Sequence, residues 1–233
     1  MPGNVPTMSV PYPHPMFVTG SFLPTDVANL VAWYKFNTGI TITGAGVSQW
    51  DDQSGNGRHL LQGTDADRPS ESGGVITFDG VRELLKVTAF TLNQPETIYI
   101  LFKSVTDTLA DRIFDGNSTN AGMMDQDAGP SLNAYAGGFI GKNLDYTGSG
   151  TYLVATCQFN GAASKLQVNS GTPVTGNGGA SNMGGFQLGG TGTNQFSNIS
   201  VLEVVITDTT ADDATAIATM ETYLQGVLTA SGL

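Results

Sequence analysis

Short β-type runs separated by turn residues cover most of this sequence and constrain its fold more than any other feature. They begin with LVAWYKF at residues 30–36 and end with FSNISVLEVVITD at 196–208, and glycine, asparagine or aspartate stands between successive runs. Glycine supplies 31 of the 233 residues and only 12% are charged, a balance that favours short strands and tight turns over long solvated helices. We therefore expect an all-β fold in which two antiparallel sheets form a jelly-roll sandwich.

The two ends of the chain depart from this pattern. Residues 1–25 carry six of the ten prolines, and proline lacks the backbone donor that a central strand needs, so we expect an extended arm there. Near the other end, Ile217, Met220 and Leu224 repeat at helical spacing, which predicts one C-terminal helix laid against the sandwich. The predicted organisation is an arm over residues 1–25 followed by a jelly-roll domain over 26–233.

The charge and the single cysteine narrow the possible partners and compartments. A formal net charge of -11 repels phosphate backbones and anionic lipid head groups, so we expect neither nucleic acid nor a membrane as partner. The sequence shows neither a bilayer-spanning apolar run nor a secretion signal, and we expect synthesis without export. In YLVATCQF, Cys157 shares a face with Leu153, Ala155 and Phe159, which predicts a buried structural thiol.

Several stretches, taken in order, resemble the concanavalin A-like lectin/glucanase superfamily, in particular the laminin-G-like jelly-roll domains of phage virion and bacterial surface proteins. The most specific is the W-x-D-x-S-G-x-G segment within GVSQWDDQSGNGRHL, followed by the F-D-G of GVITFDGVRELLKV. The others are LVAWYKFNTG, QFNGAASKLQVNSGTPV, FQLGG and the final strand with its helix, so the resemblance covers about residues 28–228. It implies two antiparallel sheets of six or seven strands each, while fold alone does not set function.

The polar stretch SQWDDQSGNGRHL at residues 48–60 has two readings. By the resemblance, Trp50 fills the space between the sheets, and Asp52 and Ser54 shape the following turn with the neighbouring glycines. Alternatively, Asp51 and Asp52 are weak candidates for calcium ligands contributed by separate loops. We expect turn chemistry here and no cofactor.

A second acidic run, DQDAG, imitates the start of an EF-hand calcium loop through Asp125 and Asp127. The twelfth position of such a loop needs a bidentate glutamate, and the chain has Ala136 there. The EF-hand match therefore fails.

Catalysis by a glucanase of this fold would need carboxylates at alternating positions on one strand. None of the five glutamates has that neighbourhood, and Glu203, alone in SVLEVVI, is expected to face solvent or a partner. His14 and His59 have no nucleophile motif near them. We therefore expect no enzymatic activity.

Sugar recognition needs only an aromatic platform and a few amide or carboxylate groups on loops. The segment SLNAYAGGFIGKNLDYTG could supply them through Tyr135, Phe139, Asn143 and Tyr146. The other reading of these aromatics is that they pack in the core or an interface.

Three functional classes remain open at this stage, and the third, a carbohydrate-active enzyme, is disfavoured because the catalytic carboxylates are missing. The first is a non-enzymatic phage virion structural protein, a capsid decoration or head-fibre protein that forms homo-oligomers and binds a capsid protein through its arm. Its anchors would be Tyr12, Met16, Phe17 and Phe22, residue types that interfaces favour. The alternative is a lectin-like module that binds glycans on a particle or host surface.

Overall fold

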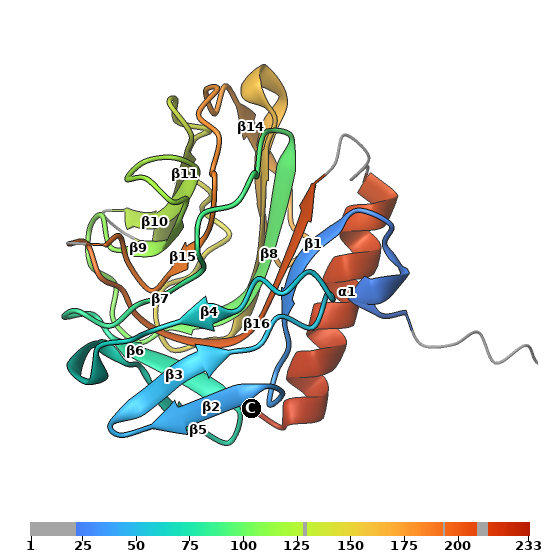
Figure 1. The fold of residues 1–233 in the computed structure, drawn as a ribbon. Coiled ribbons are helices and arrows are strands. Elements are labelled where there is room, and N and C mark those ends of the chain that lie inside the picture. The colour runs from blue at the N-terminus through green and yellow to red at the C-terminus, as the bar shows by residue number, and fades with distance from the viewer. Residues whose placement is uncertain (1–21, 128–129, 193, 209–213) are drawn as a thin grey trace, which may run out of the picture.

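The computed structural model describes residues 22–127, 130–192, 194–208 and 214–233, which form a two-sheet sandwich with one α-helix on its outside (Figure 1). The first sheet has the strand order β14-β13-β12-β8-β16-β6-β5, and β1 also pairs with β16. Its members are β1 (Leu30–Tyr34), β5 (Ser70–Ser72), β6 (Val75–Asp79), β8 (Glu96–Ser104), β12 (Leu153–Phe159), β13 (Ser164–Val168), β14 (Val174–Gly176) and β16 (Asn198–Asp208).

The second sheet has the order β11-β10-β9-β15-β7-β4-β3-β2. Its members are β2 (Ile40–Thr43), β3 (Gly46–Trp50), β4 (Leu60–Leu61), β7 (Leu85–Lys86), β9 (Arg112–Asp115), β10 (Met123–Asp127), β11 (Ser131–Tyr135) and β15 (Gln187–Leu188). Both sheets are antiparallel throughout the pairs between named strands. Each sheet thus has eight described strands, more than the six or seven that the resemblance implied.

The long strand β16 occupies the middle of the first sheet. One of its edges pairs with β8 along nearly its whole length. Its other edge pairs with β6 near its start and with β1 near its end. Segments from the beginning, middle and end of the chain therefore meet on this strand.

The main core fills the space between the sheets. Along β12, the residues Leu153, Ala155, Cys157 and Phe159 all point into it, because alternate side chains of a strand share a face. Cys157 is fully buried, which confirms the prediction of a buried thiol. Burial and the nearby Glu96 raise the pKa of this thiol well above its usual value, as expected for an unreactive cysteine.

Helix α1 (Ala214–Ser231) lies across the outer face of the first sheet (Figure 1). Its buried residues Ile217, Met220 and Leu224 pack with Trp33 and Tyr99 in a second apolar cluster. This confirms the all-β sandwich with a single C-terminal helix that the sequence predicts. Within the described ranges, no helix is long and apolar enough to cross a membrane.

Short 3-10 turns complete the described structure: η1 (Pro24–Asp26), η2 (Asp65–Asp67) and η3 (Gly161–Ala163). Most of the predicted arm falls at residues 1–21, outside the described ranges, so the division into an arm and a domain stays a prediction.

Candidate functional site

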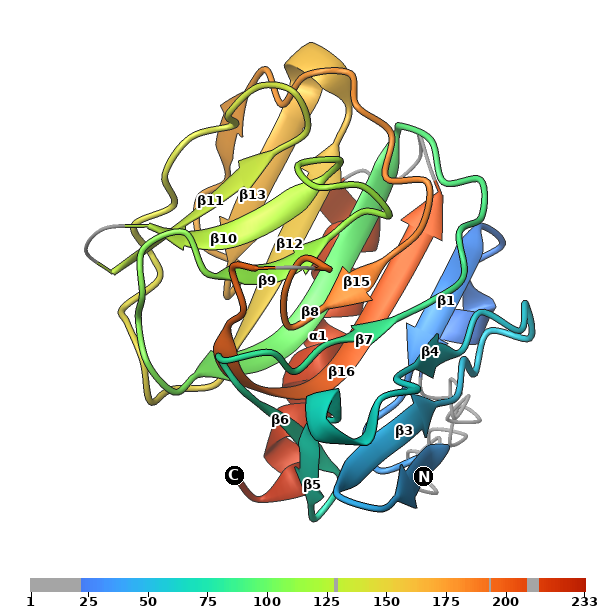
Figure 2. The same cartoon turned by 60° about the vertical axis from the view of Figure 1, so that its left-hand side comes forward.

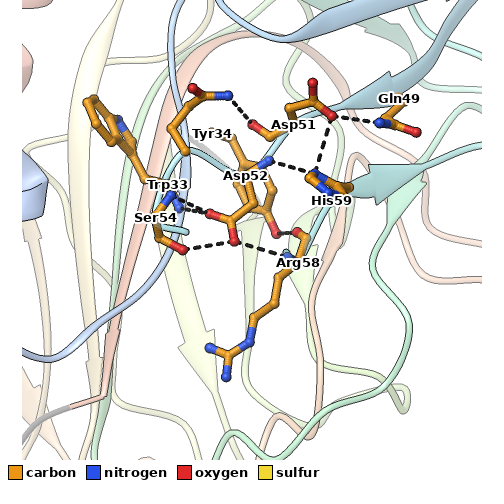
Figure 3. A network of polar contacts seen from close by, with 9 residues as sticks. Trp33, Tyr34, Gln49, Asp51, Asp52, Ser54, Arg58 and His59 are labelled. Carbon is orange, nitrogen blue, oxygen red and sulfur yellow. Dashed lines mark hydrogen bonds and ion pairs between the residues drawn. The ribbon is translucent and has the colours of Figure 1, made fainter. Parts of the chain in front are cut away.

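Asp52 is the hub of a closed polar turn (Figure 3). Its Oδ1 accepts hydrogen bonds from the backbone N–H of Trp33 at 2.9 Å and of Ser54 at 2.8 Å. Its Oδ2 accepts from the Ser54 hydroxyl at 2.8 Å and from the Arg58 N–H at 3.0 Å. Four donors fill the acceptor sites of one carboxylate, and Asp52 is only 7% exposed. Its role is to fix the turn against β1.

The two residues that precede Asp52 also make hydrogen bonds within the fold. Trp50 is fully buried between the sheets, as the resemblance implied, and its indole N–H donates to the Lys35 carbonyl at 3.1 Å. Asp51 accepts from the Gln49 amide at 2.6 Å and lies 3.2 Å from His59 Nδ1. In the described ranges, no group of three His, Cys, Asp or Glu side chains is arranged to hold a metal ion. Asp51 and Asp52 both act as hydrogen-bond acceptors within the turn.

A different polar surface lies on the outer face of the second sheet, where β9, β10 and β11 adjoin, away from α1 (Figure 2). Met124, Leu132 and Ala134 point into the core, so the alternate residues of β10 and β11 point outward. Residues directly opposite in an antiparallel pair share a face. The outward pairs are Met123 with Tyr135, Asp125 with Asn133, and Asp127 with Ser131.

An aromatic pair stands at one end of this surface. The ring centroids of Tyr135 and Phe139 lie 4.9 Å apart with the planes at 62°, an edge-to-face contact. Residues 139–143 run beside β11 and bring Phe139 next to Tyr135 through an isolated bridge. Phe139 is 62% exposed, so its ring offers apolar area to a ligand.

Two ion pairs continue the surface beyond the rings. The guanidinium of Arg112, on β9, contacts the Asp125 carboxylate and donates to Asn120 Oδ1 at 2.9 Å. The ammonium of Lys142 contacts the Asp127 carboxylate. We call the set Arg112, Asp125, Asp127, Ser131, Asn133, Tyr135, Phe139 and Lys142 the β9–β11 surface.

Buried polar atoms of the β9–β11 surface lack partners. Among the described residues, Arg112 Nε, Asp125 Oδ1 and Ser131 Oγ are buried and have no hydrogen-bond partner. Leaving a buried polar group unpaired costs about 1–3 kcal/mol, so these atoms are suited to bond an internal water; a ligand hydroxyl reaches them only when the residues that cover them move. Burial raises the pKa of Asp125 to about 6, although the neighbouring Arg112 acts to lower it.

The other two predicted glycan residues point away from this surface. Asn143 is buried, with its amide N–H donating to the Leu166 carbonyl at 3.0 Å. Tyr146 is also buried, and its hydroxyl donates to the Asp107 carboxylate. The sequence interpretation is corrected here: both side chains hold loops together and are inaccessible to a sugar.

The predicted arm anchors Tyr12, Met16 and Phe17 lie outside the described residues. Phe22 is described and packs edge-on against Tyr223 of α1, with ring centroids 6.1 Å apart. Glu203 was expected at the surface, and that expectation is wrong. It is fully buried between the first sheet and α1. There its carboxylate accepts hydrogen bonds from Trp33, Phe36 and Tyr223.

Sequence reasoning missed Arg112, Asn133 and Lys142 as members of the site. The available signal was the alternation in MMDQD, where Asp125 and Asp127 stand two residues apart as on one face of a strand. This run is poor in β-branched residues, so it was compared only with a calcium loop, which it does not match, and strand β10 was not predicted.

The fold places this chain among two-sheet antiparallel β-sandwich proteins. No family model and no curated protein matches the sequence. Among solved structures, Trypanosoma rangeli sialidase is similar with a TM-score of 0.57 and 14% identity, over 78% of this chain and 31% of the sialidase chain. An arabinofuranosidase complexed with arabinofuranosyl-alpha-1,2-xylobiose is similar with a TM-score of 0.60 and 15% identity, over 79% of this chain and 51% of that one.

These neighbours correct two expectations. The solved structures named above are a sialidase and an arabinofuranosidase, and a GH54 α-L-arabinofuranosidase soaked with a cyclic sulfate inhibitor is also similar, at a TM-score of 0.59. They redirect the interpretation from a non-enzymatic virion protein to glycan binding or processing, and they overturn the expectation of no enzymatic activity. The chain spans only about a third to a half of the length of these proteins, and at 14–16% identity the likeness shows the fold alone.

Proposed function

We propose that this chain is a carbohydrate-binding β-sandwich module whose β9–β11 surface contacts the sugar. The observation that carries the proposal is the exposed Phe139 ring, packed on Tyr135 beside a row of outward carboxylate and amide groups. Sugar sites combine an apolar or aromatic wall with a few well-placed polar groups. The β9–β11 surface has both, in the exposed Phe139 ring and the half-buried Asn133 amide.

Each part of the surface has a distinct role in this proposal. The Phe139 ring packs against the C–H face of a sugar ring, and Tyr135 holds it in place. Asn133, which is half-buried on β11, bonds sugar hydroxyls. Since Arg112 and Lys142 are already paired with carboxylates and the chain carries a net charge of -11, we expect neutral sugars to bind better than sialic acid.

The finer assignment to the concanavalin A-like lectin/glucanase type is part of the same proposal. It is supported by the sandwich fold and by the buried Trp50 followed by a polar turn, the arrangement that the resemblance implied.

Hydrolysis is a second candidate, favoured by the position and pKa of Asp125. With a pKa of about 6, this carboxyl group is suited to donate a proton to a leaving glycosidic oxygen. Asp127 stands two residues further along the same strand face, a spacing of about 7 Å along a strand. This backbone spacing lies within the range of about 6.5–9.5 Å found between the carboxyl groups of inverting glycosidases, in which the second carboxylate activates water.

The binding proposal is tested with immobilised glycans, including arabinofuranosyl-xylobiose and sialic acid, followed by calorimetry. The variant Phe139→Ala removes the exposed ring, and Leu144→Ala removes a side chain that is 73% exposed at a nearby loop position. We expect Phe139→Ala to weaken binding about tenfold or more and Leu144→Ala to leave it unchanged. Equal binding by all three proteins, or no binding to any glycan, would refute the proposal.

Hydrolysis is tested separately by release of nitrophenol from 4-nitrophenyl α-L-arabinofuranoside and related aryl glycosides. We expect any turnover to fall by a factor of about 100 or more in Asp125→Asn, with glycan binding retained. Turnover that survives the substitution would exclude Asp125 as the acid.

A further inference from the structure

An open groove runs along the outer surface of α1, on the side of the molecule away from the β9–β11 surface. Its volume is about 670 Å³, and its lining includes Phe22, Ala218, Thr222, Tyr223, Gly226 and Ala230. Small residues of one helix face form the floor, and the rings of Phe22 and Tyr223 stand beside it. The groove therefore has the aromatic wall that peptide-binding grooves use.

The chemistry of the groove is apolar and uncharged. None of the residues that line it carries a charge, in a chain whose net charge is -11. Contiguous apolar surface of this kind on a soluble domain usually marks a contact with another polypeptide segment. Its occupant should likewise be uncharged.

Residues 1–21 of the same chain are such a segment. Phe22 is the first described residue and lines the groove, so residues 1–21 are covalently attached to the groove lining. That segment contains no Asp, Glu, Lys or Arg, five prolines, and the apolar side chains of Tyr12, Met16 and Phe17. Proline-rich segments bind aromatic-lined grooves with little loss of conformational entropy.

The reach of residues 17–22 is sufficient for binding in the groove. Phe17 precedes Phe22 by five positions, and an extended chain of that length reaches about 17 Å. The groove lining runs along α1 from Thr215 to Ala230, about 22 Å of helix, and Phe22 packs on Tyr223 near its middle. Phe17 can therefore reach either end of the groove, and attachment to the same chain raises its local concentration to the millimolar range.

We propose that residues 1–21 of the same molecule bind in the α1 groove, with Met16 and Phe17 as the anchoring side chains. The segment then shields the apolar face of α1 from other molecules. This inference does not depend on glycan binding, because the groove and the β9–β11 surface lie on opposite sheets.

The test uses substitutions that fill the groove of the full-length chain and measures how fast a protease cleaves within residues 1–21. Gly226 has no heavy atom within 4 Å of an added Cβ, so Gly226→Trp places a large side chain in the groove without a clash at its base. Thr229→Trp puts the same side chain on an exposed part of the same helix that is not in the groove lining. Chymotrypsin cleavage of the Phe17–Val18 bond, followed by mass spectrometry, reports how often the segment is free.

We expect cleavage to be about tenfold faster in Gly226→Trp than in wild type and Thr229→Trp, because cleavage follows the open fraction of the segment. Near-ultraviolet circular dichroism confirms that each variant is folded, and Ala218→Trp replaces Gly226→Trp if that variant is not. Equal cleavage rates in all folded variants would overturn the proposal. So would a dimer in sedimentation that Gly226→Trp converts to a monomer, because a second copy would then be the occupant.

Discussion

The indole N–H of Trp33 donates a 2.7 Å hydrogen bond to Oε1 of Glu203, across 170 positions of sequence. The same oxygen accepts from the Tyr223 hydroxyl at 2.6 Å, and Oε2 accepts from the Phe36 N–H at 3.0 Å. Burial raises the pKa of Glu203, although these three hydrogen bonds act to lower it. One carboxylate thus ties β1, β16 and α1 together.

We expect Glu203→Gln to lower the free energy of unfolding by about 1–3 kcal/mol, because an amide NH₂ in place of either oxygen leaves at least one buried donor without an acceptor. Urea unfolding measures the change. In a double-mutant cycle with Tyr223→Phe, the double variant should lose less stability than the sum of the losses in the two single variants, since both substitutions remove the same hydrogen bond. Strictly additive losses would argue against the shared bond.

Glu96 should make the protein less stable as the pH rises. Both of its carboxylate oxygens are buried without a hydrogen-bond partner among the described residues, and burial, with Asp208 opposite it, raises its pKa to about 8. Between the ordinary value of 4.5 and about 8, the folded state holds a proton that the unfolded chain has released. The free energy of unfolding therefore falls through this window, by at most about 1.4 kcal/mol per pH unit from this group.

The isosteric change Glu96→Gln removes this titration. We expect the variant to lose less stability than wild type between pH 5 and pH 8, in urea unfolding at several pH values within that window. Glu71→Gln, at a half-buried position on an edge strand, is the matched control. A wild-type pH slope in Glu96→Gln would contradict the assignment.

Alanine substitutions at Gly189 and Gly55 distinguish the stability cost of backbone strain from that of steric overlap. Both have φ of +88°, so alanine is strained equally at either position. A Cβ at Gly189 would overlap the Phe78 ring in the core, whereas a Cβ at Gly55 meets no heavy atom within 4 Å. We expect Gly189→Ala to cost at least about 2 kcal/mol more than Gly55→Ala in chemical denaturation. Equal costs would mean that Phe78 moves aside freely.

The polar turn at Asp52 should be insensitive to metal removal. Its carboxylate oxygens already accept four hydrogen bonds, so we expect the same melting temperature with and without a calcium chelator. Trp50→Ala should cost about 3–5 kcal/mol by opening a cavity between the sheets. A melt that falls with chelator and recovers with added calcium would contradict this account.

The fold could be predicted because its signals are local. Alternation along YLVATCQF identifies the inward face of β12, and the helical spacing of Ile217, Met220 and Leu224 identifies the face of α1 that packs on the sheet. These patterns depend only on neighbouring residues.

The polar sites could not be predicted in the same way, because their members come from distant parts of the chain. Glu203 finds its donors on β1 and α1, and nothing next to it in sequence indicates them. Asn143 and Tyr146 are buried because of contacts with Leu166 and Asp107. Single-sequence reasoning detects that such residues are polar or aromatic, but their exposure depends on tertiary contacts.

The central place of β16 has a consequence for synthesis of the protein. The strand pairs with β1, β6 and β8, yet it is translated after all of them. At ordinary translation speeds the ribosome needs roughly 5–20 seconds to proceed from the end of β8 to the end of β16. During that interval the nascent chain carries strand edges that only its last strand can cover, and such edges are templates for pairing with other chains. The yield of this protein in a cell should therefore depend on chaperones that bind those edges before translation ends.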